Sequence, residues 1–443
     1  MVEANIKIIE ELKCFLQTVC NDPMIRRLVT QSESNFIRER KLPLERIASL
    51  VINMPKRSLS IEIQEFFYYL GNDLKPSTKG AFSLQRGKLK PLFFEVWNQW
   101  LVSCFYHYYG EKVKRWKGFR VQAVDGSTAY LMNKKEVIEY FGTQDNQHVS
   151  IPMARVMQIQ DILNDITVRG VIRPIKESEK SIMAGWVSDL YEDSITLMDR
   201  GYPSYGLMYL MNNQETPRRF VMRCKESFNK EVKQFMHSRK NTKIIKLRPS
   251  PNAIVRLGEQ GYIITGETTI TVRIVKVKLG SGEVEVLLTN LYDEKLFTTE
   301  DLKYLYGLRW GIETTYCKQK NQQQMEQFSG HRVICIQQDY AAGLFVANLQ
   351  SLVEKQCENY LHEINKRRKY RYKINRNISW ASLKNKIIKL FLHNETEQLL
   401  QQLQKEFERN TEPIRPGRHY PRIIKAKRLH GKYQTFTNYR RAI

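Results

Sequence analysis

Three kinds of sequence feature are scarce or missing in this chain, and each absence excludes a class of protein. Only seven cysteines occur in 443 residues, without a C-x-x-C pair, so neither a disulfide framework nor a zinc site is indicated and a reduced cytoplasm is favoured. Among the longest apolar runs is "AAGLFVANL" (341–349), far short of the roughly 18 residues needed to span a membrane. The opening "MVEANIKIIEEL" carries early acids and no signal-peptide core, so we expect a cytoplasmic protein without a membrane partner.

Acidic residues are also scarce relative to basic ones. The chain has 71 Lys and Arg against 46 Asp and Glu, a net charge of +25, and residues 361–443 alone hold 21 basic and 6 acidic side chains. Such a charge favours polyanionic partners, with nucleic acid first and an anionic membrane second. In "NKRRKYRYKINRNISW" (365–380) cations alternate with aromatics, and "RIIKAKRLHGK" (422–432) adds charge. Both segments suggest a DNA-contacting surface, although a solvated basic face would look the same.

Residues 1–115 show helical spacing of apolar positions, and residues 60–90 within them suggest a DNA-binding motif. One apolar helix ends near Gly71, and a second begins after Pro76 with Ser77 or Thr78 available as its cap. This pattern is typical of a helix-turn-helix with a basic second helix, whose exposed side chains would contact DNA. Two packed helices with solvated lysines remain the alternative. The candidate contacts on the second helix are Lys79 and Arg86.

The pattern changes at residue 119 to alternating strands. "FRVQAV" stops at "DGST", and two further strand-like segments flank Asn164-Asp165, a plausible hairpin turn. A helix, the short strand "SITLM", a second helix and the strand-like "RRFVMRC" follow. These elements predict an α/β unit with a mixed sheet. Residues 226–290 are β-rich and basic, with a turn at Gly280-Ser281-Gly282, and helices return from Thr298, where "TTEDL" offers a capping box.

Two aspartates occupy equivalent places in this unit. Asp125 and Asp199 each follow an apolar strand, and each is followed by a glycine within two residues. A strand end can hold a carboxylate rigidly, and a nearby glycine lets backbone or ligand approach closely. Asp-Gly and Asp-Arg-Gly are also ordinary turn signals, so either aspartate alone would favour a turn.

The segment "YLYGLRWGIETTYCKQK" (304–320) strengthens the functional interpretation. As a single helix it places four polar side chains within roughly 60° of one another at about 100° per residue; they are Tyr306, Arg309, Glu313 and Lys320. An apolar stripe beside them would pack on a core, although a salt-bridged amphipathic helix would have the same pattern.

Together with Asp125 and Asp199, Glu313 would complete an oxygen-rich site for Mg²⁺ or Mn²⁺. Two such ions about 3.5–4 Å apart can activate a water or a 3′-hydroxyl and stabilise the leaving oxygen of a phosphodiester. Arg309 and Lys320 would hold phosphates beside this centre. A nuclease or strand-transfer site therefore accounts for both the acids and the neighbouring bases.

At these motifs the chain resembles the DDE transposases of bacterial insertion sequences, of the IS-four type. "AVDGST" is similar to the segment with the family's first catalytic aspartate, and "LMDRGYPS" to the second. Residues 306–320 match the family's Y-x-x-R-x-x-x-E-x-x-x-x-x-x-K signature with every spacing intact. The likeness is strong over about 119–350 and weaker before it, where "STKGAFSLQRGKL" is similar to the family's N-terminal DNA-binding region.

The resemblance implies an α/β (α+β) protein with a ribonuclease H-like catalytic core. Its expected regions are a helical DNA-binding region (1–115), the core (116–360) with a β-rich insertion (about 226–290), and a basic helical C-terminal region (361–443). It further implies cut-and-paste transposition with two Mg²⁺ or Mn²⁺ ions, acting on the terminal inverted repeats and target DNA as a homodimer. Tyr306, Arg309, Lys320 and Arg200 would contact DNA.

One departure from the family concerns an aromatic residue. Some relatives carry a tryptophan just before the strand corresponding to "LLTNL", which stacks a flipped base, whereas this chain has "GEVEV" there. Trp310 is a candidate substitute, although core packing is the simpler expectation for it.

Two alternative functions remain open. The first is a catalytically inert DNA-binding relative that represses transposition. The second is a basic RNA-binding or ribosome-associated protein whose aspartates only make turns, which leaves the signature helix unexplained.

Overall fold

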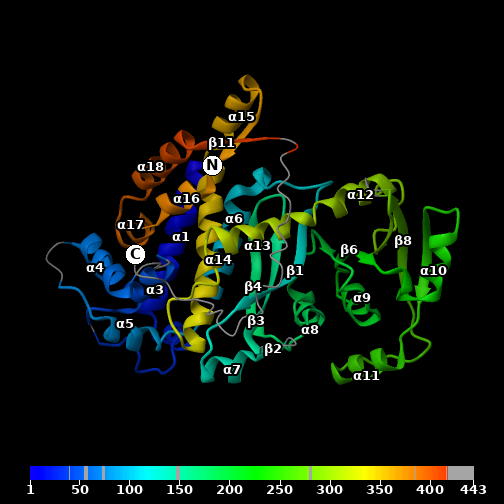
Figure 1. Cartoon of the computed structure of the whole chain (residues 1–443), viewed down its shortest axis with the longest axis horizontal. Helices are drawn as coiled ribbons and strands as arrows, with labels where there is room; N and C mark the ends of the chain where they lie inside the picture. Colours follow the sequence, from blue (N-terminus) through cyan, green and yellow to red (C-terminus); the bar gives the residue numbers. More distant parts are fainter. Residues whose placement is uncertain are drawn as a thin grey trace.

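The computed structural model describes residues 1–38, 40–53, 58–71, 75–145, 150–278, 282–384, 386–415 and 417. Helices from both ends of the chain lie together on the left of Figure 1, and a large sheet with its own helices lies to their right. In this described part of the chain, no helix has the length and apolar character that a membrane crossing requires. The expected basic segment 422–432 lies outside the described residues.

A nine-stranded mixed sheet forms the centre of the molecule. The strands are β1 (Arg120–Tyr130), β2 (Thr143–Asp145), β3 (Ser150–Asp161), β4 (Ile166–Pro174), β5 (Ser194–Met198), β6 (Arg219–Cys224), β7 (Thr242–Leu247), β8 (Ile270–Lys278) and β9 (Val284–Thr289). From the β4 edge the order is β4-β3-β1-β5-β6-β9-β8-β7, and β2 pairs with the start of β3. Strands β1, β5 and β6 run parallel, and every other pairing is antiparallel. The predicted mixed α/β fold is therefore confirmed.

The predicted strands of the α/β unit are all present, although β3 begins at Ser150, four residues before the predicted start. Asp165 has a φ of 53° in the turn between β3 and β4, a conformation that Asp tolerates better than most residues. The predicted end of the first strand is also wrong, because β1 continues through Asp125 to Tyr130. It continues because β3 pairs with it over its whole second half, from Gln122 to Tyr130. Strands β8 and β9 pair as predicted, whereas residues 279–281 of their turn lie outside the described residues.

Helices cover both faces of the sheet. The helices of this part are α7 (Lys135–Phe141), α8 (Glu179–Ala184), α9 (Tyr205–Asn212), α10 (Lys230–His237), α11 (Pro251–Glu259), α12 (Thr299–Gly307), α13 (Trp310–Asn321) and α14 (Val333–Gln356). Helices α8 to α11 share one apolar core with the sheet, and α7, α12, α13 and part of α14 share the core on its other face. The region 226–290 is therefore mixed, since β7, β8 and β9 extend the main sheet while α10 and α11 pack on it.

The two ends of the chain share a third core, built around α14. Its other helices are α1 (Val2–Asn21), α2 (Pro23–Val29), α3 (Leu44–Ile52), α4 (Leu59–Leu70), α5 (Lys79–Arg86), α6 (Leu92–Tyr109), α16 (Arg376–Leu383), α17 (Lys386–Leu392) and α18 (Thr396–Arg409). Trp97 of α6 stacks on Phe345 of α14 with ring centroids 4.3 Å apart, and Phe391 of α17 meets the same indole at 4.9 Å. Helix α15 (Glu358–Arg367) and the two-stranded sheet of β10 (Arg371–Ile374) and β11 (Thr411–Ile414) complete the C-terminal region.

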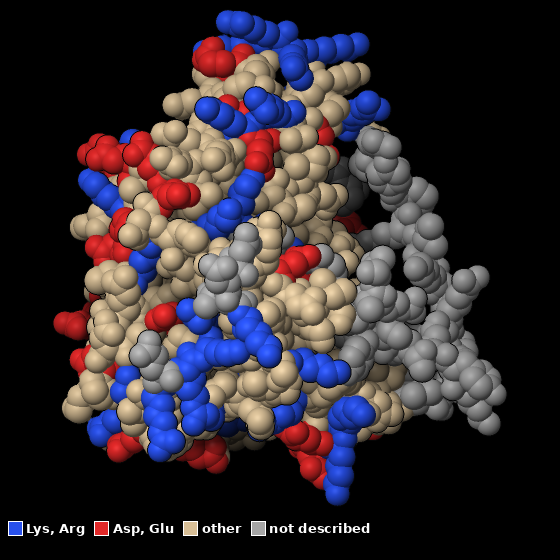
Figure 2. Space-filling view, turned by 90° about the vertical axis from the view of Figure 1, so that its left-hand side faces the viewer, with Lys and Arg blue, Asp and Glu red and all other residues tan. Residues whose placement is uncertain are grey.

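Helix α5 begins as predicted, because the Thr78 hydroxyl caps it by accepting from the amide of Ala81 at 3.1 Å. The expectation that Arg86 is exposed is wrong. Its side chain is 2% exposed, with Nη2 2.9 Å from Oδ1 of Asp339 and Nε donating to Gln338 at 2.6 Å. Arg86 therefore fastens α5 to α14 and is not available for DNA. Lys79 at the start of α5 is exposed, and Figure 2 shows Lys and Arg gathered on the lower half of this helical face.

A partly buried ion network connects the C-terminal region to α13 through the β3–β4 turn. The Asp165 carboxylate pairs with Lys318 of α13 at 3.2 Å and with Arg376 of α16, which also pairs with Glu354 of α14 at 3.2 Å. Burial alone would raise the pKa of Asp165, but Arg376 and Lys318 outweigh it and lower the pKa to about 2. Ionised Asp165 therefore stabilises the folded chain.

We expect Asp165→Asn to lower the free energy of unfolding at neutral pH by about 1–2.5 kcal/mol, since each pH unit between folded and unfolded pKa values is worth about 1.4 kcal/mol. The folded pKa lies below the ordinary 3.8, so the contribution is present above pH 3.8 and disappears as the pH falls towards 2. The variant should consequently lose less stability than the wild type between those two values. Urea unfolding at several pH values measures this. Asp189→Asn, which breaks an exposed pair with Arg169, is the control and should cost at most about 1 kcal/mol.

Candidate active site

The sheet register brings the two candidate aspartates together. Val124 of β1 is paired with Met198 of β5 in parallel register, and this is the last pair between the two strands. Asp125 and Asp199 each follow one member of that pair, so the two aspartates lie side by side where β5 ends. Beyond this point β5 ends while β1 continues, and Asp125 is therefore held by a strand on one side and faces a turn on the other.

Backbone amides fix both carboxylates. Oδ1 of Asp125 accepts from the amide of Gly126 at 2.9 Å, and Oδ1 of Asp199 accepts from the amide of Gly201 at 2.7 Å. A side chain at Gly201 would begin 2.9 Å from that Asp199 oxygen, so the glycine allows the close approach. Burial raises the pKa of Asp125 to about 7, and the charge of Asp199 contributes to the rise. Asp125 is thus a largely buried carboxyl group with a second carboxylate beside it.

The signature segment differs from the predicted single helix. Helix α12 ends at Gly307 and α13 begins at Trp310, with Leu308 and Arg309 in the turn between them. The amides of Arg309 and Ile312 donate to carbonyls three residues back, at 3.1 and 3.2 Å, instead of four. This tighter winding interrupts the helical period that placed Tyr306 and Glu313 on one stripe. The capping box at Thr298 and Asp301 is confirmed.

Arg309 connects the signature segment to the aspartates. Its Nη2 lies 2.9 Å from Oε1 of Glu313, and its charge also acts on Asp125 and opposes the rise in the Asp125 pKa. Only 7% of the Arg309 side chain is exposed, against 34% of Glu313. Tyr306 lies against Arg309 and is 6% exposed, and neither its hydroxyl nor Nε of Arg309 has a hydrogen-bond partner in the structure. The structure therefore brings Asp125, Asp199, Tyr306, Arg309 and Glu313 into one region.

The other residues predicted to contact DNA lie apart from one another. Lys320 of α13 donates to the carbonyl of Thr128 on β1 at 2.6 Å and lies 3.6 Å from Oε1 of Glu326. It therefore ties α13 to β1. Arg200 follows Asp199 directly and is exposed, whereas Lys79 lies on α5 in the helical part of the molecule.

A fourth carboxylate, which no sequence pattern indicates, lies at this site. Glu179, the first residue of α8, lies so close to β1 that a Cβ on Gly126 would be 2.2 Å from its carboxyl carbon. Its Oε1 pairs with Arg155 of β3 at 2.6 Å, and Tyr202 donates to its Oε2 at 3.2 Å. Glu179 also contributes to the raised pKa of Asp125. Only the packing of α8 on β1 and β3 reveals it, because "KESEK" matches no site pattern.

Carboxylate oxygens are the ligands that Mg²⁺ and Mn²⁺ prefer, and the charges of Asp199 and Glu179 both act on Asp125. The donor chemistry therefore fits a hard divalent ion. Within the described ranges, however, no group of three or more His, Cys, Asp or Glu residues is positioned to hold a metal ion. Glu313 is engaged by Arg309, so joining the two aspartates requires it to leave that ion pair.

The segment that lacks the family's tryptophan carries an ion pair. Glu285 on β9 lies 2.9 Å from Arg223 of β6, so its charge is balanced locally. Trp310 is 57% exposed, and the expectation that it packs in the core is wrong. Its ring lies 5.3 Å from the Arg309 guanidinium, at the edge of the site.

Comparison with known proteins places the chain among the relatives of transposases. It is 21% identical over 311 residues, 67% of its length, to the transposase InsG of the insertion sequence element IS4 from Escherichia coli. It is also 24% identical over 110 residues, 24% of its length, to the putative transposase InsZ of the same organism. The resemblance to IS4-type transposases is therefore confirmed.

These matches cover only part of the relatives as well. The chain spans 66% of the length of InsG and 37% of that of InsZ, and no family model matches it. Among solved structures, a cryo-EM structure of the piggyBac transposase synaptic complex with hairpin DNA is similar with a TM-score of 0.42 and 11% identity. That alignment covers 98% of this chain and 89% of the other.

Proposed function

We propose that this protein is a DDE transposase that cleaves DNA at the terminal inverted repeats of an insertion sequence and joins the freed ends to target DNA. The observation that supports this most is the register of β1 and β5, which sets Asp125 beside Asp199. Arg309, in the turn before α13, acts on Asp125 and pairs with Glu313 of α13. The kinship with InsG agrees with it.

The strand arrangement supports a ribonuclease H-like catalytic core. A run of three antiparallel strands, β4-β3-β1, continues into the parallel strands β5 and β6. Asp125 lies on the central strand β1, and Asp199 follows its parallel neighbour. In this proposal residues 116–360 form the core, and β7, β8 and β9 with their helices form the insertion within it.

Asp125, Asp199 and Glu313 would hold two Mg²⁺ or Mn²⁺ ions. The bound ions would activate the attacking water or 3′-hydroxyl and stabilise the leaving oxygen of the phosphodiester. Arg309 has two tasks in this scheme. In the free protein its guanidinium pairs with Glu313. In the DNA complex the guanidinium would instead bind a phosphate, and the Glu313 carboxylate would then be released to hold a metal ion.

The DNA contacts follow from the positions of the cations. Tyr306, Arg309 and Lys320 would hold phosphates of the transposon end, and Arg200 would contact the strand beside Asp199. Exposed Lys79 of α5 would bind the repeat away from the site of cleavage, together with other cations of the helical face in Figure 2. A homodimer would pair two transposon ends in the bacterial cytoplasm, associated with the nucleoid.

The decisive experiment is incubation of the protein with DNA that carries the inverted repeats flanking its gene, with and without Mg²⁺. We expect strand cleavage at the repeat ends in the presence of Mg²⁺ and binding alone in its absence. Binding without cleavage under both conditions would favour the inert repressor. If a matched RNA bound more tightly than the repeat DNA, the ribosome-associated alternative would replace this proposal.

Tyr306→Phe separates a DNA-binding role from a structural one. The hydroxyl is buried without a partner, so its removal should leave the melting temperature unchanged or slightly higher. A hydrogen bond to a charged group is worth about 1.5–3 kcal/mol, so loss of a phosphate contact should weaken DNA binding about tenfold or more. Fluorescence anisotropy with repeat DNA measures the affinity, and Tyr304→Phe, at an exposed tyrosine of α12, is the matched control. Unchanged affinity of the Tyr306 variant would remove this residue from the DNA interface.

A further inference from the structure

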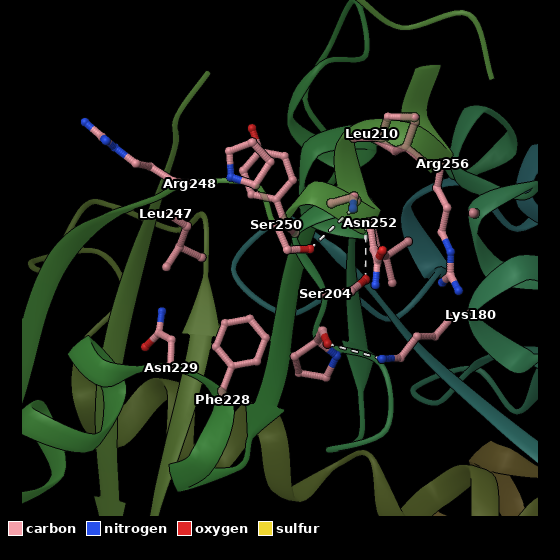
Figure 3. A pocket seen from close by; sticks show the side chains of 18 of the residues that line it. Lys180, Ser204, Leu210, Phe228, Asn229, Leu247, Arg248, Ser250, Asn252 and Arg256 are labelled. Carbon is pink, nitrogen blue, oxygen red and sulfur yellow. Dashed lines mark hydrogen bonds between the residues drawn. The ribbon is translucent and has the colours of Figure 1, made fainter. Parts of the chain in front are cut away.

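A cavity of about 1110 Å³ lies on the face of the sheet covered by α8 to α11 (Figure 3). Its walls come from α8, α9, α11, the segment before α10 and the end of β7. Its volume exceeds the roughly 300–1,000 Å³ of pockets that enclose a drug-sized ligand. The cavity is therefore large enough for a section of a polymer.

Cations dominate the wall of this cavity. Lys180 of α8, Lys246 of β7 and Arg256 of α11 line it, and none of them forms an ion pair with a described residue. Arg248 also lines it but pairs with Glu267 at 3.1 Å and points away from the other cations in Figure 3. The acids on the wall are Glu231 and Glu259. Burial lowers the pKa of Lys180, and the nearby cations Lys225 and Arg256 lower it further.

Three helices also begin at this cavity. Ser204, Asn229 and Ser250 are the N-caps of α9, α10 and α11, and all three line the wall. The N-terminus of a helix carries partial positive charge, so all three helices add to the potential of Lys180 and Arg256. The combined field favours an anion, and three separate positive helix ends suit a ligand that carries several negative groups.

The cavity begins directly beyond Asp199. The chain passes from Asp199 through a short turn to Ser204, and Lys180 donates to the carbonyl of Pro203 in that turn at 3.4 Å. The charge of Asp199 also acts on Lys180. Helix α13, with Glu313 and Lys320, packs on the opposite face of the sheet. Asp199 therefore lies between the signature segment on one face of the sheet and the cationic cavity on the other.

We propose that this cavity binds backbone phosphates of the DNA strand on the far side of the scissile bond, outside the transposon end. The inference rests on the proposed function, in which the signature segment holds the transposon end itself. A DNA strand that passes from α13 across the end of the sheet at Asp125 and Asp199 would reach Lys180, Ser204 and Arg256 on the other face. The cavity then holds the flanking DNA while the bond is cut.

The test compares two duplexes, one that ends at the inverted repeat and one that continues for a helical turn of flanking DNA. Dissociation constants of the full chain are measured for both over a range of salt concentrations. Each phosphate contact contributes about 0.9 to the slope of log affinity against log salt. The wild type should therefore bind the flanked duplex more tightly and with a steeper slope.

The informative variant is Lys180→Gln with Arg256→Gln. It should bind the repeat-only duplex as the wild type does, while its slope for the flanked duplex becomes shallower by about one to two units. Lys233→Gln with Lys243→Gln, two exposed lysines of the same region that do not line the cavity, is the control with equal charge change. If the double variant has a lowered melting temperature, Arg256→Gln alone replaces it, and its salt slope for the flanked duplex should become shallower by about one unit.

Two outcomes would overturn the inference. The first is a salt slope for the flanked duplex that is equal in the double variant and in its control. The second is an equal loss of affinity of the double variant for both duplexes, which would make the cavity a general DNA contact. Cleavage by the wild type is measured on the same flanked duplex. If the wild type cleaves normally with Mg²⁺ but the double variant has the wild-type salt slope, only the assignment of the cavity is wrong. If the wild type does not cleave but the salt slopes change as expected, only the proposed chemistry is wrong.

Discussion

Asp125→Ala or Asp199→Ala is expected to abolish DNA cleavage while binding to the inverted repeats is largely preserved. The carboxylates are proposed metal ligands and do not contact DNA themselves. Loss of a group that only supports a metal ligand typically costs about 10–100-fold in metal affinity or activity, and loss of the ligand itself should cost more. Cleavage assays and gel shifts on the same preparations measure the two properties.

Stability measurements keep this test interpretable. Burial and the charge of Asp199 raise the pKa of Asp125 to about 7, so ionising Asp125 destabilises the folded chain as the pH rises from about 4 to 7. Asp125→Ala should therefore unfold no more easily than the wild type at pH 7 without metal. A variant that is folded and binds DNA but does not cut it supports the assignment, and near-normal cleavage by either alanine variant contradicts it.

Glu313 needs a different substitution. Alanine would leave the Arg309 guanidinium, only 7% exposed, without its partner, and loss of one member of a buried pair is costly. Glu313→Gln keeps a hydrogen-bond acceptor for Arg309 but removes the charge that a metal requires. We expect it to lose cleavage as completely as the aspartate variants. If cleavage survives in Glu313→Gln, the third ligand is another acid, and Glu179 is the one that also lies beside Asp125.

Arg86→Ala is expected to lower the free energy of unfolding by about 3–5 kcal/mol, the usual cost of removing one partner from a buried ion pair. Arg86 and Asp339 are 2% and 3% exposed, and the guanidinium also donates to Gln338 and to the carbonyl of Cys335. Its loss leaves Asp339 buried without that cation and loosens α5 from α14. Urea unfolding at neutral pH measures the loss.

Lys79→Ala is the matched comparison, because it removes an equal charge from the same helix at an exposed position. It should change stability by less than about 0.5 kcal/mol, as surface substitutions usually do, and should weaken repeat binding if α5 faces DNA. Replacing Arg86 and Asp339 together by Met and Leu should recover part of the stability, because no charge is then left unpaired. An Arg86→Ala protein as stable as the wild type would contradict the buried pair.

Local patterns in the sequence were sufficient for the elements around the site and for its two aspartates. Alternating apolar residues predicted the start of β1 and the pair β8 and β9, and a short apolar run predicted β5. Thr298 and Thr78 indicated the helices that they cap. Asp125 and Asp199 stood out because each follows an apolar strand and precedes a glycine, which is also a local property. Glu313 was selected from its place on the polar stripe expected at residues 304–320, and the resemblance to a family then matched the same residue.

Tertiary contacts decided everything that depends on partners distant in sequence. Arg86 has the spacing of an exposed helix residue, yet Asp339, more than 250 residues later, draws it into the core. Strand β1 continues past Asp125 because β3 pairs with it, and the helix expected at 304–320 winds more tightly at Leu308 and Arg309. Glu179 reaches the site only because α8 packs on β1, and Trp97 meets Phe345 and Phe391 only because both chain ends wrap around α14. Periodicity records which face of an element is apolar, whereas the identity of the group across that face depends on how the whole chain packs.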